Sequence, residues 1–152
     1  MKKRQAIIES ATRLFGSLGF DATTTLEIAD EADVTEPLIF YHFRGKGELF
    51  THSLELAFKE YFSRLDELPK HPSTEFQKII SLINLHFKVV DEMPDQMRLI
   101  VSACPAKLHD PNGICLKNIK RARNLVMDYV NGCLNAGIKN REFHQVPVSV
   151  TG

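Results

Sequence analysis

Hydrophobic residues recur at helical spacing along most of the chain, and this pattern predicts helices without strands. Residues 4–18 carry one continuous apolar stripe, which is typical of a helix with one buried face. Gly19 and Phe20 follow it as a left-handed end residue and a hydrophobic contact back onto the last turn. The stripe consists of Ile7, Ile8, Ala11, Leu14, Phe15 and Leu18.

Two short helices are predicted next, joined by a tight turn. Thr24 and Glu27 have the spacing of a capping box, in which each side chain satisfies a free backbone N–H at the helix start. Thr35 offers a second N-cap after Asp33 and Val34. The first helix would turn Leu26, Ile28, Ala29 and Ala32 inward, and the second Ile39, Phe40 and Phe43. The second would turn Glu36, Pro37, Leu38, Tyr41 and His42 outward.

This arrangement is typical of a helix-turn-helix, whose second helix lies in the major groove of DNA. We therefore expect an all-α protein in which a three-helix DNA-binding domain, residues 1–48, precedes a helical regulatory domain, residues 49–152.

The regulatory half is predicted to contain four further helices. A long helix over 46–68 would span both domains, and residues 69–73 form the clearest linker. The helix over 76–90 is apolar around most of its circumference and is expected to be buried on several sides. Residues 96–108 predict a helix that is bent or broken at Pro105. Residues 114–134 predict a last strong helix, with Gly137 and Ile138 as its C-cap.

Composition limits the class of protein. The chain has 152 residues, of which 43% are hydrophobic, and a net charge of zero. It contains no uncharged apolar run long enough to cross a membrane, so we expect a cytoplasmic protein with no membrane contact. The three cysteines are widely spaced and lack a C-x-x-C pair, so neither a disulfide framework nor a zinc site is predicted. No phosphate loop, nucleophile motif or paired-carboxylate site is present, and we expect no enzymatic activity, catalytic residue, metal or cofactor.

Charge within residues 1–50 bears on DNA binding. Six Lys or Arg residues stand against eight Asp or Glu residues, which argues against tight non-specific binding, since phosphate neutralisation supplies most of that affinity. Five of the six positive residues lie at two edges of the segment, with Lys2, Lys3 and Arg4 at one and Arg44 and Lys46 at the other. The first group is explained equally well as a DNA-contacting arm or a solvated terminus.

From about Arg4 to Leu49 the chain resembles the DNA-binding domain of the TetR family of transcriptional regulators. The resemblance rests on ordered matches at Leu18-Gly19-Phe20, Ala22-Thr23-Thr24, Glu27-Ile28-Ala29, Ala32, Val34-Thr35, Phe40-Tyr41-His42-Phe43, Lys46 and Glu48-Leu49.

The resemblance implies two kinds of DNA contact. Phosphates or sugars would be contacted by Thr24, Thr35, Tyr41, His42 and Lys46, and base edges would face residues 35–38 and Tyr41. Glu36 could accept a hydrogen bond from a cytosine amine.

Two residues depart from the family pattern, which usually has glycine at each position. Asp33 stands where the turn commonly needs positive φ, which Asp tolerates better than most residues. Pro37 has no N–H to donate and disfavours helical geometry at Glu36, so Glu36 could replace Thr35 as the cap of the recognition helix.

The same resemblance implies a ligand-responsive repressor whose second half binds a small apolar molecule. Large or flexible apolar side chains line such pockets, although each candidate is explained equally well as core. His86, in mid-helix, is more typical of a hydrogen-bonded core histidine. The candidates are Phe58, Phe62, His86, Phe87, Met97, Ile100, Cys104, Val126 and Tyr129.

Two other modes of regulation are compatible with the sequence. The same fold could respond to oxidants or metals through Cys104, His109 and Cys115, or it could act as a DNA-binding adaptor without a small ligand.

Assembly follows from the mode of DNA binding. A homodimer on a palindromic operator is expected, since one helix-turn-helix contacts one half-site. Family members form dimers through helices that would follow this chain, so we expect the natural protein to continue and residues 1–152 to be mostly monomeric. Alternatively, residues 96–134 form the dimer contact.

Overall fold

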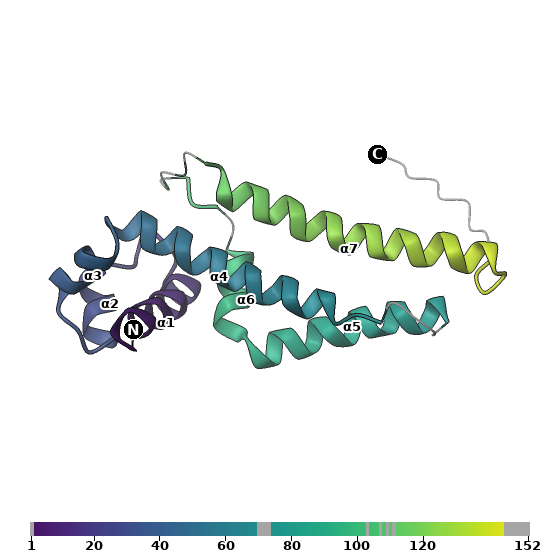
Figure 1. The fold of residues 1–152 in the computed structure, drawn as a ribbon, viewed down its shortest axis with the longest axis horizontal. Helices are drawn as coiled ribbons and strands as arrows, with labels where there is room; N and C mark the ends of the chain where they lie inside the picture. Colours follow the sequence, from purple (N-terminus) through teal and green to yellow (C-terminus); the bar gives the residue numbers. More distant parts are fainter. Residues whose placement is uncertain are drawn as a thin grey trace.

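The computed structural model describes residues 2–69, 74–102, 104–106, 108, 110 and 112–144, and within these it contains helices and no strands (Figure 1). The predicted all-α class is confirmed. The helices are α1 (Lys2–Leu18), α2 (Thr25–Glu31), α3 (Glu36–His42), α4 (Lys46–Asp66), α5 (Glu75–Glu92), α6 (Pro94–Val101) and α7 (Ile114–Lys139). None of the helices in the described ranges is long and apolar enough to cross a membrane.

Helices α1–α3 form a compact head at the end of the molecule that carries the N-terminus (Figure 1). The predicted stripe of α1 supplies its core, with Ile7, Ala11 and Phe15 fully buried. Gly19 has φ +85°, and the ring of Phe20 lies 5.9 Å from that of Phe15. The predicted end of α1 is therefore confirmed.

Three expected core residues of the head are exposed instead. Leu18 is 51% exposed, Leu26 56% and Phe40 52%, while Leu38, expected to point outward, is partly buried against the core. The inner face of α3 is set by Ile39 and Phe43, and each step along a helix rotates the side chain by about 100°. Phe40 follows Ile39 directly, so its side chain points about 100° away from this inner face and is exposed.

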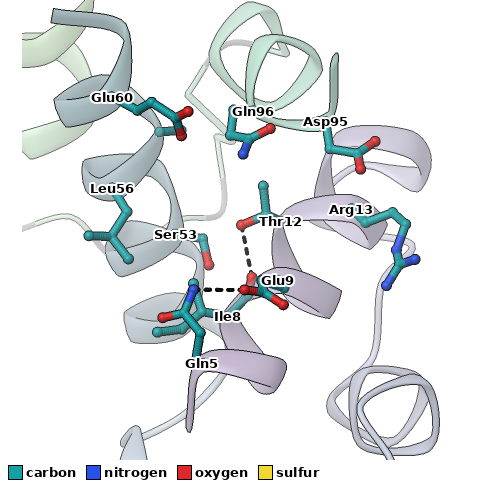
Figure 2. Close-up of a pocket in the computed structure, with 11 residues that line it drawn as sticks. Gln5, Ile8, Glu9, Thr12, Arg13, Ser53, Leu56, Glu60, Asp95 and Gln96 are labelled. Carbon is teal, nitrogen blue, oxygen red and sulfur yellow. Dashed lines mark hydrogen bonds between the residues drawn. The ribbon is translucent and has the colours of Figure 1, made fainter. Parts of the chain in front are cut away.

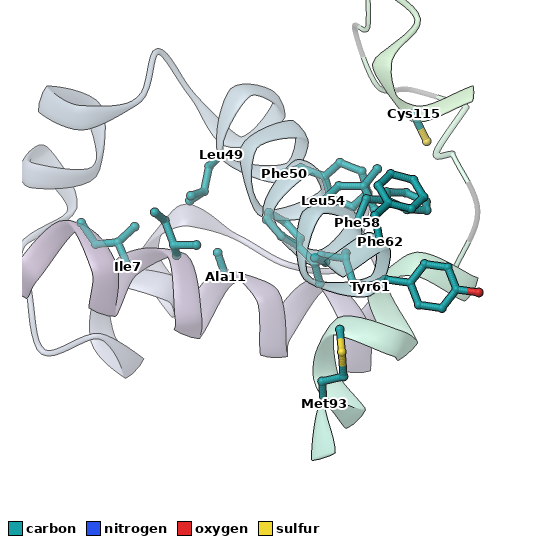
Figure 3. Close-up of a cluster of buried hydrophobic side chains, with 14 of the residues drawn as sticks. Ile7, Ala11, Leu49, Phe50, Leu54, Phe58, Tyr61, Phe62, Met93 and Cys115 are labelled. Atoms are coloured by element: carbon teal, nitrogen blue, oxygen red, sulfur yellow. The ribbon is translucent and has the colours of Figure 1, made fainter. Parts of the chain in front are cut away.

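Helix α4 joins the head to the rest of the molecule. Its inward side forms an aromatic and aliphatic column that runs from Leu49 through Phe50 and Leu54 to Phe58 and Phe62, all of them buried (Figure 3). The predicted long helix is confirmed, although it ends at Asp66. A single continuous core thus connects the two halves.

Helix α5 differs from its prediction. Within Glu75–Glu92, all of it described, Leu82 and Val89 are the only buried apolar residues. The prediction of burial on several sides is therefore wrong, because the helices that pack on it, chiefly α4, α6 and α7, cover one side. The exposed apolar residues alternate four and three positions apart: Phe76 (57% exposed), Ile80 (38%), Ile83 (45%), Phe87 (73%) and Val90 (55%).

The last two helices also have different ends from those predicted. Helix α6 begins at Pro94 and stops at Val101. Helix α7 continues through Gly137 to Lys139, and the left-handed residue after it is Arg141, with φ +61°. A Cβ on Gly137 would collide with the ring of Phe143. This glycine therefore serves close packing, and the predicted C-cap there is wrong.

Candidate nucleic-acid interface

The start of α2 is fixed by the predicted capping box. The backbone N–H of Thr24 donates to Glu27 Oε2 at 2.8 Å, and the backbone N–H of Glu27 donates to Thr24 Oγ1 at 3.1 Å. The backbone N–H and the hydroxyl of Thr24 both donate to the Glu27 carboxyl, and these two bonds lower its pKa. Thr24 is exposed, but its hydroxyl also donates to Glu27 at 2.8 Å, so a phosphate would have to share this group.

The turn between α2 and α3 has the predicted strained residue. Asp33 has φ +51°, and the N–H of Val34 donates to Ala29 O at 3.0 Å to close the turn. Thr35 is the N-cap of α3, so the helix starts where the capping pattern placed it and not with Glu36 as cap. The Thr35 hydroxyl makes no capping bond and is exposed, which leaves it available to a phosphate or base.

A polar contact holds α3 against α2. The hydroxyl of Thr25 donates to Glu36 Oε1 at 2.6 Å, which spans the turn and fixes the angle between the two helices. Pro37 occupies the first turn of α3, where no N–H is needed, and is exposed. Glu36 therefore has a structural role in addition to the base contact that was predicted for it.

The outer face of α3 carries unusually exposed aromatic side chains for a seven-residue helix. Tyr41 is 81% exposed and Phe40 52%, while Ile39 behind them is fully buried. Leu38 and His42 are half-buried at its edges. Helix α3 is thus anchored by a buried inner side and exposes aromatic rings and the Tyr41 hydroxyl on its outer side. Such a surface is suited to contact another molecule.

Lys46 has a structural role that the sequence did not indicate. Its ammonium donates to the carbonyl oxygens of Phe20 at 2.8 Å and Thr23 at 2.9 Å, and lies 4.5 Å from the centre of the Phe20 ring. Thr23, fully buried, donates through its hydroxyl to Gly19 O at 2.8 Å. Lys46 thus ties the first turn of α4 to the loop after α1. The phosphate contact predicted for it stays a prediction.

Arg4 belongs to the fold of the head. Its guanidinium lies 5.1 Å from the centre of the Phe43 ring and donates to His52 Nε2 at 3.0 Å. Burial, followed by the charge of Arg4, lowers the pKa of His52. An unprotonated Nε2 is required to accept from a guanidinium. Arg4 therefore links the start of α1 to the end of α3 and to α4.

The head meets α6 at a close contact. A Cβ on Gly16 would lie 2.9 Å from the carbonyl oxygen of Asp95 and 3.3 Å from the backbone nitrogen of Leu99. Beside this contact, α1, α4 and α6 border a polar cavity of about 330 Å³. Figure 2 shows Thr12 and Ser53 on opposite helices of the cavity with Gln96 above them. The head and α6 are thus packed directly together.

Three of the nine predicted ligand residues come together in an apolar hollow between α5 and α7. His86, Phe87 and Val126 line it with Leu82, Ile83 and Val90, and its volume is about 510 Å³. The other six do not line it: Phe58 and Phe62 are core, and Met97, Ile100, Cys104 and Tyr129 pack against the core.

His86 is held by two hydrogen bonds within the protein. Its Nδ1 lies 2.8 Å from Leu82 O, which can only accept, so Nδ1 carries the proton and Nε2 accepts from the Tyr61 hydroxyl at 3.0 Å. Both ring nitrogens are used, and the ring offers the hollow only its apolar edge.

Cys104 and Cys115 form a disulfide, contrary to the prediction. The two cysteines are eleven positions apart in the sequence, and the turn after α6 brings their Cα atoms to 5.8 Å from each other. Spacing along a chain does not reveal such a turn. Cys133 is free and buried. The described residues contain no group of three or more His, Cys, Asp or Glu side chains that could hold a metal ion, and His109 of the metal prediction lies outside them.

A capped first helix, a tight turn and a second helix with an exposed outer face define a helix-turn-helix domain of the DNA-binding class. Residues 7–52 match the family described as "Bacterial regulatory proteins, tetR family". Residues 7–52 are therefore a DNA-binding domain of the TetR-family type.

A curated relative matches about half of the chain. "Probable HTH-type transcriptional regulator YttP" of Bacillus subtilis (strain 168) is 39% identical over 72 residues, which are 47% of this chain and 35% of YttP. The chain therefore spans about a third of the length of that curated relative.

Solved structures share the fold across almost the whole chain. The TetR family transcriptional regulator PfmR from Thermus thermophilus has a TM-score of 0.74 at 20% identity, covering 97% of this chain and 77% of PfmR. The regulator FadR from Bacillus subtilis, solved in complex with stearoyl-CoA, has a TM-score of 0.64 at 20% identity, covering 93% of this chain and 74% of FadR.

Proposed function

We propose that this protein is a cytoplasmic transcriptional regulator, acting as a repressor, that reads DNA with the outer face of α3. The observation that carries the proposal is that face itself. Tyr41 is 81% exposed on a helix whose other side is locked to the core through Ile39 and to α2 through Glu36. The residues that contact DNA are Thr24, Thr35, Glu36, Pro37, Leu38, Tyr41, His42 and Lys46.

The regulated form is a homodimer on a palindromic operator. One α3 helix contacts one half-site, and affinity in helix-turn-helix proteins comes from two heads spaced by about 34–36 Å or a multiple of it. Because the head is net acidic, non-specific affinity from phosphate contacts is weak. Two simultaneous half-site contacts therefore decide where the protein binds.

A small apolar molecule in the hollow between α5 and α7 releases the protein from DNA. The walls of the hollow are apolar side chains, and both ring nitrogens of His86 are hydrogen-bonded within the protein, to Tyr61 and to Leu82. A ligand that prefers one arrangement of α4, α5 and α7 would shift the spacing of the two heads, so that ligand and DNA weaken each other's binding.

DNA binding is tested by selecting fragments from a random library and measuring their affinity by fluorescence anisotropy. We expect a palindromic site and a loss of affinity in Tyr41→Ala that is similar for all sequences, because phosphate contacts position the protein without reading bases. Glu60→Gln, on the far part of α4, is the matched control. If no sequence is enriched, the proposal is wrong.

The ligand is tested by titrating stearoyl-CoA into the complex of protein and selected DNA, with free coenzyme A as the control that lacks the apolar chain. The probe suits apolar walls, and it is the compound seen with the FadR neighbour. Release of DNA by stearoyl-CoA alone, and its loss in Val126→Asp, would support the hollow as the site. Equal release by both compounds would exclude it.

A further inference from the structure

We propose that Cys104 and Cys115 form a thiol–disulfide site that reacts with low-molecular-weight disulfides and changes the affinity of the head for DNA. The effect on DNA rests on the proposed function, whereas the chemistry of the site does not. The structure contains the oxidised form, in which the disulfide closes the segment between α6 and α7.

The two sulfurs differ in access. Cys115 is 2% exposed in the first turn of α7, whereas Cys104 is partly buried in the turn after α6. An incoming reagent can therefore reach Cys104 first, and Cys115 acts as the resolving partner. Thiols exchange with disulfides through a mixed disulfide of this kind.

The exchange conserves electrons and protons. The Cys104 thiolate attacks one sulfur of a disulfide R–S–S–R and releases one thiolate RS⁻. The Cys115 thiolate then attacks Cys104 Sγ and releases the second RS⁻. The protein dithiol loses two electrons and two protons, and the reagent leaves as two RSH molecules. Excess RSH reverses both steps.

Residues Leu108 and Asp110, between the two cysteines, lie beside the start of α4. Asp110 accepts from the N–H groups of Ile114 and Cys115, at 2.9 Å each, and so fixes the segment to the start of α7. Leu108 packs toward Gly47, where an added Cβ would lie 3.8 Å from Leu108 Cδ1. Asp110, Asn112 and Ile114 border an open cavity of about 560 Å³ together with the first turns of α4.

That part of α4 also holds the head. Lys46, next to Gly47, donates to the carbonyls of Phe20 and Thr23, and His52, which lines the cavity, accepts from Arg4. Opening the disulfide releases the covalent link that holds Leu108 and Asp110 beside this turn. The redox state is thereby coupled to the position of the head through direct contacts.

The site itself is tested by mass spectrometry of the full chain in a Cys133→Ser background, which leaves only the two cysteines in question. The protein is reduced with dithiothreitol, freed of reagent and exposed to oxidised glutathione. We expect a transient adduct of one glutathione, followed by loss of two hydrogens and a Cys104–Cys115 cross-link in the peptide map. A stable adduct without a cross-link would overturn the site.

Coupling is tested on the same samples by the affinity for the selected DNA fragment. We expect the two redox states to differ at least about fivefold in dissociation constant, a size usual for allosteric coupling. Cys104→Ser, at the more accessible position, should be insensitive to the reagents. Leu108→Ala should keep the cross-link and lose most of the difference.

Affinities that agree within about twofold in the two states, well below the usual size of such coupling, would overturn the coupling while leaving the DNA-binding function intact. A protein that forms and opens the cross-link but binds no DNA in either state would overturn the DNA-binding function and leave the redox site standing.

Discussion

The head (α1–α3) and the layer formed by α5 and α7 differ in how far they bury their apolar side chains. In the head, Phe15, Ile28 and Ile39 are fully buried, and apart from Leu18 the exposed large apolar residues lie on α2 and α3. In the outer layer, α5 buries Leu82 and Val89 and exposes a stripe over its whole length. The head gains its rigidity from a filled core, whereas α5 is held along one side only.

This difference would be refuted if a buried phenylalanine of the head and an exposed phenylalanine of α5 contributed equally to the free energy of unfolding. Phe15→Ala should lower the free energy of unfolding by about 3–5 kcal/mol, because a large cavity is left in a close-packed core. Phe87→Ala, at a side chain that is 73% exposed, should change it by no more than about 0.5 kcal/mol. Urea denaturation followed by circular dichroism measures both. A large cost at Phe87 would show that something covers α5 in solution.

The substitution Lys46→Met tests how much the contact between α4 and the loop after α1 contributes to stability. It keeps the apolar stem of the side chain and removes the ammonium. Two carbonyls lose their donor, and we expect a loss of roughly 1–3 kcal/mol in unfolding free energy. Lys3→Met, at an exposed position, is the control. If Lys46 also binds a phosphate, the salt dependence of DNA binding should fall by about one unit; an unchanged slope would limit it to the structural role.

Leu38 is half-buried against the core of the head, on the helix that we propose to face DNA. Leu38→Ala should relax the preference at one position of the operator, where the side chain meets a thymine methyl, at a cost of about 1 kcal/mol at the cognate site. Affinity for a panel of single-base variants measures this. A lower melting temperature with unchanged specificity would assign Leu38 to the core.

We expect the contact between the end of α7 and the start of α5 to depend on pH. The Glu142 carboxylate accepts from the N–H groups of Glu75 at 2.9 Å and Phe76 at 2.7 Å, and these bonds lower its pKa below the ordinary 4.5. A depressed carboxyl pKa stabilises the fold above the unfolded value and loses that effect as pH falls through the folded one. The difference in melting temperature between wild type and Glu142→Gln should therefore vanish in acid. A difference independent of pH would refute the ionised contact.

The sequence predicted the parts of the fold that depend on near neighbours. The capping box at Thr24, the strained turn at Asp33 and the end of α1 at Gly19 are all local, and the structure confirms them. The hydrophobic pattern located α4 and α5 but could not tell which apolar residues on a helix would be covered. Phe40 and Phe87 are exposed because the neighbouring helices leave those sides free, which spacing does not encode.

Long-range contacts were missed for the same reason. Lys46 reaches the carbonyls of Phe20 and Thr23, 26 and 23 positions earlier, and only the path of the chain brings them together. The pairing of Cys104 with Cys115 depends on the turn after α6, and the bonds of Glu142 depend on how the chain returns to α5 after α7. Of the ligand candidates, His86 and Phe87 share a helix, whereas Val126 joins them only through packing.

The contact at Gly16 limits how this protein can be recombined with others. Any side chain at this position would press on the backbone of α6, so the head is fitted to one particular helix of the second half. A chimera that joins residues 2–66 to a foreign regulatory domain would bring an unmatched surface to α1. The exchangeable unit is therefore the head together with α4 and α6, and a hybrid regulator with a working signal should inherit all of these helices from one parent.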